Sequence, residues 1–238
     1  MIKIKTMFKR EIVDNVIVSI SPEVVEGCEW VLNEPCIATR KMDGTAAAII
    51  EGRLYARLDY KNLKSKILPE GAIACQPEPD LITGSHPYWV PVAKDGVNVL
   101  NALEFRTADV VTDMGYKHHY KAFKRLLEGV EVHNLTDLDG SYELCGNKVK
   151  NNPEQLDTTK LIKHGSIVLE GVGRTFESIK EYLENHYIEG IVFYRQNGDM
   201  AKIKRTDCGL EWRGDKRRVS TKEGYAKRRK KKKYYGRK

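Results

Sequence analysis

The chain has 238 residues, of which 41% are hydrophobic and 31% are charged. This length suits one large domain, or one domain with an appendage, and the composition suits a globular core. No apolar run approaches the roughly 18 residues of a membrane helix, and the charged N-terminus lacks the apolar segment of a signal peptide. Five scattered cysteines without a C-x-x-C pair argue against a disulfide framework and a zinc ribbon. We therefore expect an intracellular, cytoplasmic protein with reduced thiols.

Positive charge is concentrated at the C-terminal end of the chain. The net charge is +8, but residues 215–238 alone hold thirteen Lys or Arg and two acids, which leaves residues 1–214 slightly acidic. Such a basic block repels itself, so we predict one domain over 1–214 and a disordered tail over 215–238. The tail could bind a polyanion by releasing counterions. A solubilising or localisation role is the alternative.

The first half of the chain predicts antiparallel strands and one long loop. Residues 35–40 lead into the first strand, and the Glu51-Gly52 pair reads as a hairpin turn after it. Five of the eight prolines lie in 68–94, so we expect a long surface loop or a flap there. Strands are predicted over residues 45–50, 53–58 and 99–105.

The second half predicts two helices and four strands. Tyr116, Tyr120, Phe123 and Leu127 have helical spacing, which indicates an amphipathic helix over 116–127. Thr175 could cap a second helix that carries apolar residues on one face, namely Phe176, Ile179 and Leu183. Strands are predicted over 140–144, 166–169, 190–195 and 200–204, the last two flanking a hairpin turn at Asn197-Gly198. The sum is an α+β domain built mainly on antiparallel sheet.

A lysine at the end of a predicted strand begins the pattern that carries chemistry. Lys41-Met42-Asp43-Gly44 places this lysine before a glycine turn, at the mouth of a sheet. Four residues with one free position recur by chance, so a solvated surface turn is the alternative for this motif alone. Further charged residues follow in later segments, in the order Arg57, Glu143, Glu189, Lys202 and Lys204.

These later residues fall into an acidic and a basic set. Lys202 and Lys204 share one face of a strand, so their ammonium groups repel each other unless an anion lies between them. Glu143 and Glu189 flank apolar strands, where unpaired carboxylates are costly, and structural ion pairs are the alternative reading. A polyphosphate carrying Mg²⁺ would satisfy both sets, because hard cations take carboxylate oxygens.

The ordered set resembles the covalent nucleotidyltransferase superfamily of ATP-dependent DNA and RNA ligases and mRNA capping enzymes. Its motifs run K-x-D-G, an arginine, a glutamate, E/D-G-V-V and K-x-K. The chain is most similar to the compact ATP-dependent 5′-to-3′ RNA ligase family of animals and viruses, over most of 39–212. The similar blocks are TRKMDGT, YARLDYK, WVPV, YELCGNKVKNNPE, LIKHG, IEGIVFY and AKIKRTDCGLEW. The resemblance implies an adenylyltransferase (ATP-grasp-like ligase) domain with no OB domain.

The resemblance implies a three-step reaction and assigns its catalytic lysines. Lys41 would attack the α-phosphate of ATP, AMP would pass to an RNA 5′-phosphate, and a 3′-hydroxyl would displace it. Lys202 and Lys204 would bind the α-phosphate and stabilise its charge. Together with a bound Mg²⁺ ion, for which Mn²⁺ could substitute, they would lower the pKa of Lys41. A solvated strand face is the alternative for Lys202 and Lys204.

The nucleotide-binding set implied by the resemblance surrounds these lysines in sequence. Its members are Thr39, Arg40, Asp43, Gly44, Arg57, Glu143, His164 and Glu189, with Glu143 and Glu189 also as metal ligands. Relatives typically carry an acidic residue where this chain has Arg40, which affects base recognition. The adenine platform would be His164 or Ile167. The bland alternatives are an Asx-turn for Asp43, a salt bridge across the hairpin for Arg57 and a loop histidine for His164.

The expected partner is RNA with 5′-phosphate and 3′-hydroxyl ends, bound by a monomer without a protein partner or membrane. Predicted RNA contacts are Lys61, Asn147, Asn152, Arg228 and Lys230, with ordinary loop residues as the alternative for the first three. Residues 213–216 read R-x-D-K, a motif of OB-domain ligases, but lie too close to Lys204 and are interpreted as a coincidence. Some other group must then order the pyrophosphate, and the basic tail could contribute.

The sequence thus predicts an ATP-dependent RNA ligase that acts through lysyl-AMP and adenylylated RNA. One alternative is a GTP-dependent RNA capping enzyme or a DNA ligase of the same superfamily. A second alternative is a non-catalytic nucleic-acid-binding protein with a ligase-like fold. The small chain would suit a virus, and repair of cleaved RNA would suit the activity.

Overall fold

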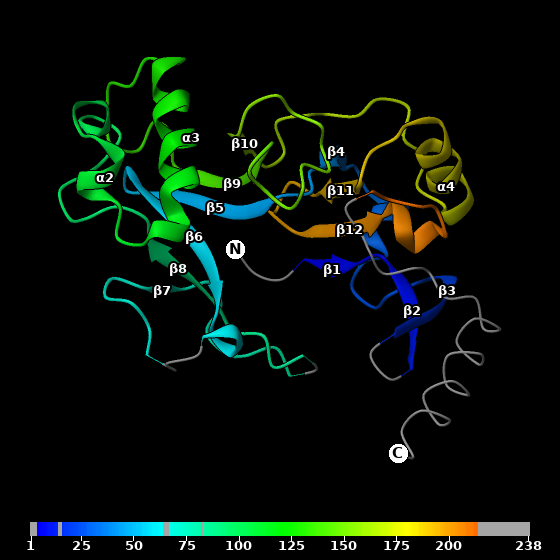
Figure 1. Cartoon of the computed structure of the whole chain (residues 1–238). Helices are drawn as coiled ribbons and strands as arrows, with labels where there is room; N and C mark the ends of the chain where they lie inside the picture. The colour runs from blue at the N-terminus through cyan, green and yellow to red at the C-terminus, as the bar shows by residue number, and fades with distance from the viewer. Residues whose placement is uncertain (1–3, 14–15, 64–66, 82, 214–238) are drawn as a thin grey trace, which may run out of the picture. The chain divides into compact units, whose positions relative to one another are not determined.

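The computed structural model describes residues 4–13, 16–63, 67–81 and 83–213 (Figure 1). This part of the chain divides into two compact units. The first unit consists of residues 42–166, and the second combines 4–41 with 167–213. The predicted tail, with Arg228 and Lys230, lies outside the described residues, and a single domain over 1–214 stays a prediction. Within the described residues, no helix is long and apolar enough to span a membrane.

A six-stranded antiparallel sheet forms the centre of the first unit, in the order β10-β9-β5-β6-β8-β7. The predicted hairpin is confirmed: Glu51 and Gly52 have φ angles of 49° and 74°, as a type I′ turn requires. Both backbone N–H groups donate to the carboxylate of Asp139. The strands are β5 (Thr45–Ile50), β6 (Arg53–Asp59), β7 (Ile73–Ala74), β8 (Pro87–Pro91), β9 (Gly140–Cys145) and β10 (Lys160–Lys163).

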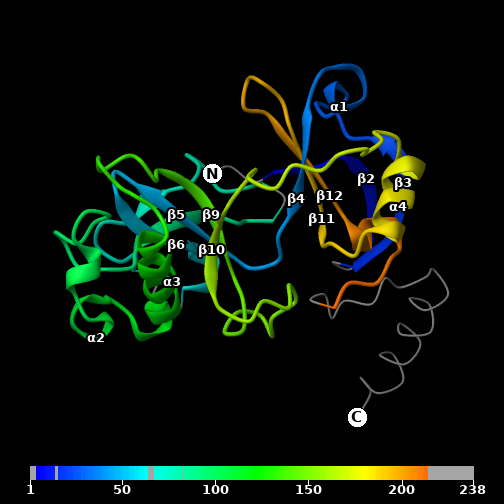
Figure 2. The same ribbon diagram turned by 90° about the horizontal axis from the view of Figure 1, so that it is seen from above.

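The predicted amphipathic helix is α3 (Lys117–Glu128), which lies along this sheet in Figures 1 and 2. Tyr120, Phe123 and Leu127 are buried in one cluster with Ile49 of β5 and Leu54 of β6. The helical period therefore aligned the apolar side chains as expected. Shorter helical pieces in this unit are η1 (Tyr60–Asn62), η2 (Ala102–Glu104), α2 (Thr107–Val110) and η3 (Met114–Tyr116).

Three expectations for the first unit and its end were wrong in part. The segment 68–94 contains β7 and β8, and its two strand prolines stand at the ends of β8, where a missing N–H costs least. Residues 99–105 form a turn and η2 rather than a strand, because Val99, Ala102 and Phe105 reach the core at a helical spacing while Leu100 and Leu103 are exposed. Within 166–169 only Val168 forms a bridge, to Thr39, and it is 58% exposed.

A four-stranded sheet in the order β1-β12-β11-β4 organises the second unit. Its strands are β1 (Lys5–Thr6), β4 (Ile37–Lys41), β11 (Gly190–Tyr194) and β12 (Met200–Lys204), and β2 (Phe8–Val13) pairs with β3 (Val16–Val24). Only β1 and β12 pair in parallel among the described strands. The predicted β11–β12 hairpin is confirmed, with Gly198 at φ 91°. The α+β class with mainly antiparallel sheet is likewise confirmed.

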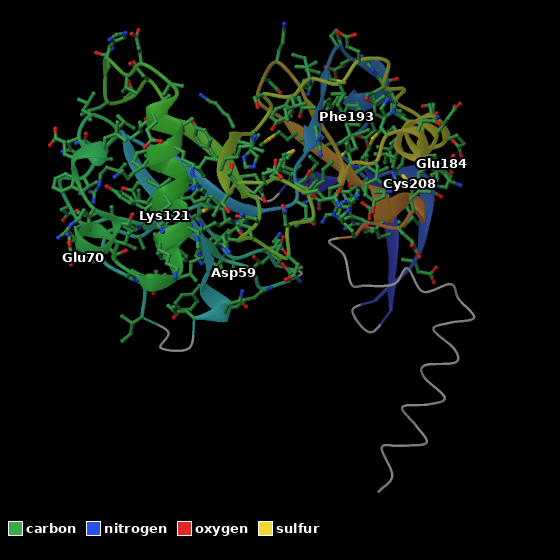
Figure 3. The ribbon with its side chains drawn as sticks, turned by 45° about the horizontal axis from the view of Figure 1, so that its top comes forward. Asp59, Glu70, Lys121, Glu184, Phe193 and Cys208 are labelled. Atoms are coloured by element: carbon green, nitrogen blue, oxygen red, sulfur yellow. The ribbon has the colours of Figure 1, made fainter. Side chains whose placement is uncertain are left out.

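The core of the second unit fixes which face of β12 carries the lysines. Ala201 and Ile203 pack with Phe193 and with Ile179 of α4 (Phe176–Asn185); Phe193 and Cys208 of this core are labelled in Figure 3. Because side chains alternate along a strand, Lys202 and Lys204 lie on the opposite face. Thr175 caps α4 as predicted, accepting from the N–H of Ser178 at 3.2 Å. The remaining pieces are α1 (Trp30–Asn33) and η4 (Arg205–Cys208).

Candidate active site

Strand register brings two of the predicted lysines together in the second unit. Gly190, the first residue of β11, pairs with Lys204 of β12 on one side and with Lys41 of β4 on the other. Glu189 directly precedes Gly190 in the chain. The ends of β4, β11 and β12 therefore meet at one edge of the sheet, although more than a hundred residues separate β4 from the other two strands in the sequence.

The carboxylate of Glu189 joins both lysines. Its Oε2 lies 2.6 Å from Nζ of Lys41, and its Oε1 lies 2.7 Å from Nζ of Lys204. The Glu189 side chain is only 4% exposed, against 20% for Lys41 and 25% for Lys204. Glu189, which the sequence placed beside an apolar strand, is thus paired with two lysines. Its carboxylate lies between the charges of Lys41 and Lys204.

Lys202 has the most perturbed charge in this group. Burial, followed by the charges of Lys41, Lys204 and Arg10, lowers the pKa of Lys202 to about 8. The charge of Glu189 acts in the opposite direction but is the smallest of these effects. The cluster therefore holds more positive charge than its own acid offsets, which favours a bound anion.

Arg10 and Asp207 complete this cluster, and the sequence reasoning missed both. Nη2 of Arg10 lies 2.5 Å from each carboxylate oxygen of Asp207, whose side chain is 1% exposed. Asp207 also accepts a hydrogen bond from the backbone N–H of Lys204 at 2.9 Å. Asp207 lies in the AKIKRTDCGLEW block, so the resemblance pointed to its neighbourhood; Arg10 had no sequence signal.

Thr39 and Arg40 lie on β4 ahead of Lys41. The hydroxyl of Thr39 is buried and donates to the carbonyl of Val192 at 3.1 Å, so it links β4 to the neighbouring strand β11. The backbone N–H of Arg40 donates to the carbonyl of Ile167 at 2.9 Å. A nucleotide contact for Thr39 or Arg40 stays a prediction.

A second group of predicted residues meets within the first unit, around Glu143 of β9. Its Oε1 accepts from the N–H of Gly44 at 3.0 Å, and its Oε2 lies 3.0 Å from Nε2 of His164. Nδ1 of His164 lies 2.9 Å from the hydroxyl of Ser141. A Cβ added to Gly44 would lie 2.1 Å from the carbonyl oxygen of Leu144, so only glycine fits this close approach.

A loop after β9 holds Asp43. The N–H of Asp43 donates to Glu154 at 2.7 Å, and its carboxylate lies 3.1 Å from Nζ of Lys150. Four non-glycine residues of this loop have φ between 46° and 60°, namely Lys150, Asn151, Asn152 and Gln155. Such left-handed residues cost roughly 1–2 kcal/mol each, so the surrounding contacts must hold the loop in place. Sequence reasoning missed Lys150 and Glu154, although both lie in a family-like block.

The other predicted residues of the first unit have local contacts. Arg57 of β6 pairs in register with Trp89, and burial raises the pKa of the Cys75 thiol while the nearby Arg57 charge acts in the opposite direction. Lys61 donates to the carbonyl of Thr83 at 3.4 Å. The side-chain amides of Asn147 and Asn152 donate to carbonyls within the same loop, those of Asp157 and Leu156. RNA contacts of Lys61, Asn147 and Asn152 stay predictions.

Within the described residues, no group of three or more His, Cys, Asp or Glu side chains could hold a metal ion. Glu189 and Glu143 are single carboxylates, which suits Mg²⁺ when substrate phosphates supply other ligands. Arg213, the first residue of the R-x-D-K match, packs against Tyr187, with its guanidinium 4.5 Å from the ring centre. Residues 214–216 of this match lie outside the described residues.

Comparison with known families identifies one match. Residues 71–236 match the family described as RNA ligase 1, which is well over half of the chain. The matched region includes Glu143, Glu189 and the β12 lysines, and begins after Lys41-Met42-Asp43-Gly44. No curated protein matches the chain.

Proposed function

We propose that this chain, which belongs to the RNA ligase 1 family, is an ATP-dependent RNA ligase that joins 5′-phosphate and 3′-hydroxyl ends. The reaction would run through lysyl-AMP and adenylylated RNA on an adenylyltransferase fold. The observation that carries the proposal is the pairing of Lys41 and Lys204 by the single carboxylate of Glu189, beside Lys202. A half-buried lysine cluster with excess positive charge suits a nucleotide polyphosphate.

In the first step, Nζ of Lys41 would form a bond to the α-phosphorus while the bond to pyrophosphate breaks. The attacking amine must be unprotonated, whereas lysine is ordinarily charged at neutral pH. Glu189 lies 2.6 Å from this nitrogen, so it orients the amine and is within reach of its proton. The same AMP would then pass to an RNA 5′-phosphate, and the RNA 3′-hydroxyl would release it.

Lys202 and Lys204 would stabilise the negative charge that builds on the α-phosphate. Both lie on the outward face of β12, away from the core that holds Ile203. Mg²⁺, or Mn²⁺ in its place, would neutralise phosphate charge, with Glu189 and Glu143 as its protein ligands. The nucleotide contacts of Thr39, Arg40, Asp43, Gly44, Arg57 and His164 are part of the proposal, as is a cytoplasmic, viral-type role in RNA repair.

Two alternatives are tested by the same experiment. A capping enzyme would accept GTP, and a non-catalytic RNA-binding protein would accept neither nucleotide. The purified protein is incubated with Mg²⁺ and α-labelled ATP or GTP, denatured and examined for label on the chain. We expect label from ATP in the wild type and in Lys180→Arg, and none in Lys41→Arg. Lys180 is the matched control because it lies in the same unit, in an exposed ion pair with Glu184.

Three results would contradict the proposal. Label from GTP alone would favour a capping enzyme. Full label in Lys41→Arg would exclude this lysine as the nucleophile. Absence of label, together with absence of an AMP mass on the purified chain, would favour the non-catalytic reading.

A further inference from the structure

Four cations of the second unit lie on or beside strands β4 and β12. Lys41 lies on β4, and Lys202 and Lys204 lie on β12, with β11 between the two strands. On the other side of β12 is β1, whose Thr6 pairs with Lys202, and the chain continues from β1 into β2, where Arg10 lies. Arg10 belongs to the separate β2–β3 pair and reaches this group through Asp207, which follows β12 in the chain and also accepts the N–H of Lys204.

Arg10 is held beside this group by a buried acid. Asp207 contacts Nη2 of Arg10 with both oxygens and also accepts the N–H of Lys204. Within the described residues, Nε of Arg10 is buried without a hydrogen-bond partner. The Arg10 charge is near enough to lower the pKa of Lys202, although burial and the other two lysines have larger effects. The Arg10 side chain as a whole is 22% exposed, so part of the guanidinium faces solvent beside the lysine cluster.

The direction of the proposed reaction gives this arginine a role. In phosphoryl transfer the attacking and leaving atoms lie roughly in line with phosphorus. With Lys41 attacking from the β4 side, pyrophosphate would leave toward β12 and the Arg10–Asp207 pair that lies beside its end. A guanidinium is suited to this group, because its planar donors match phosphate oxygens.

We infer that Arg10, positioned by Asp207, binds the β- and γ-phosphates of the nucleotide and the pyrophosphate that leaves. This inference rests on the proposed function. It supplies, from the N-terminal part of the chain, a group that would order the pyrophosphate in the first step. The basic tail is then not required for this contact.

The test separates the step that involves pyrophosphate from the step that does not. Arg10→Gln should slow formation of lysyl-AMP from ATP by about 10- to 100-fold, because one charge-stabilising donor is lost. In the reverse reaction, labelled lysyl-AMP enzyme should need correspondingly more pyrophosphate to regenerate ATP. Sealing of chemically adenylylated RNA, in which no pyrophosphate takes part, should be unchanged. Arg10→Lys should restore part of the lost rate.

Two controls keep the result interpretable. Lys9→Gln removes the same charge from the neighbouring residue, whose exposed side chain pairs with Glu23, and should leave all three measurements unchanged. Arg10→Gln leaves the Asp207 carboxylate buried without its partner and could unfold the chain. The double variant Arg10→Gln, Asp207→Asn removes both charges, and should show the same selective loss with a melting temperature near that of wild type.

The inference is overturned if Arg10→Gln and the double variant lose sealing as much as lysyl-AMP formation, which would indicate a structural role. It is also overturned if the pyrophosphate dependence of the reverse reaction is normal. Either result leaves the proposed function intact, since the wild type still forms lysyl-AMP. A wild type that takes no label overturns the proposed function, and the inference with it.

Discussion

The carboxylate of Glu189 shows how this molecule keeps like charges together. Lys41 and Lys204 would repel each other at the end of the sheet, and Glu189 contacts both at 2.6–2.7 Å from a side chain that is almost fully buried. Removing one member of such a buried group is costly, because the remaining charges stay desolvated. Lys202 lies near Lys41, Lys204 and Arg10, and burial together with these like charges lowers its pKa.

Replacing Lys202 should stabilise the protein in the absence of nucleotide. Its pKa is about 8 in the folded chain against an ordinary 10.5, so between these values the unfolded chain binds more protons and stability rises with pH. Below pH 8 the charged lysine imposes its full cost. Lys202→Met should therefore raise the free energy of unfolding at pH 7 by about 3 kcal/mol, a gain that disappears near pH 10.5. Urea titrations across this pH range measure it.

The control for this prediction is an exposed lysine. Lys121 lies on the outer face of α3 and is labelled in Figure 3. Lys121→Met should show no pH-dependent gain over the same range. A gain for Lys202→Met that is equal at pH 7 and pH 10.5 would mean that apolar packing, rather than charge removal, causes it.

At the scale of elements, the β4–β11–β12 pairing builds the cluster. Gly190 pairs with both lysine-bearing positions, and a Cβ on it would lie 2.2 Å from the carbonyl oxygen of Ile203. The backbones of β11 and β12 therefore approach each other where only a hydrogen fits. Gly190 follows Glu189 in the chain, so the distance between β11 and β12 at Gly190 also determines how far Lys204 lies from the Glu189 carboxylate.

Gly190→Ala should push β11 away from β12. We expect a loss of about 1–3 kcal/mol in the free energy of unfolding, the usual range for overpacking, together with loss of lysyl-AMP formation. The matched control is Gly129→Ala at the end of α3, where the nearest atoms to an added Cβ are 3.7 Å away. Chemical denaturation of both variants decides the matter; equal stabilities would show that the sheet yields without effect.

At the scale of the whole molecule, charge is divided unequally along the chain. Residues 215–238 carry an excess of eleven positive charges, whereas the preceding residues are slightly acidic. Nonspecific attraction of RNA should therefore depend mainly on the tail, because net attraction follows the local excess of positive charge.

Removing residues 215–238 should weaken binding of single-stranded RNA and flatten its salt dependence. Each phosphate contact that is lost should lower the log–log slope by about 0.7. Fluorescence binding titrations at several salt concentrations give both slopes, and lysyl-AMP formation by the shortened chain serves as the folding control. Equal slopes would favour the solubilising or localisation role instead.

Local patterns in the sequence predicted local structure well. The β5–β6 turn, α3, α4 and the β11–β12 hairpin each depend on residues within one or two turns of the chain, so periodicity and turn chemistry suffice. The common face of Lys202 and Lys204 followed from strand alternation alone. The error at 99–105 has the complementary cause: an apolar run reports burial, and burial can occur without a strand.

Tertiary structure alone decided which charged groups meet. Arg10 and Asp207 are 197 positions apart, and Asp43 reaches Lys150 and Glu154 across more than a hundred. No local period relates such residues, because their contacts depend on which strands become neighbours and in what register. The order of the chemistry-bearing residues, and the elements that carry them, followed from local patterns in the sequence. Their pairing, through one carboxylate at the end of a sheet, arose only when distant strands packed together and excluded water from the charges between them.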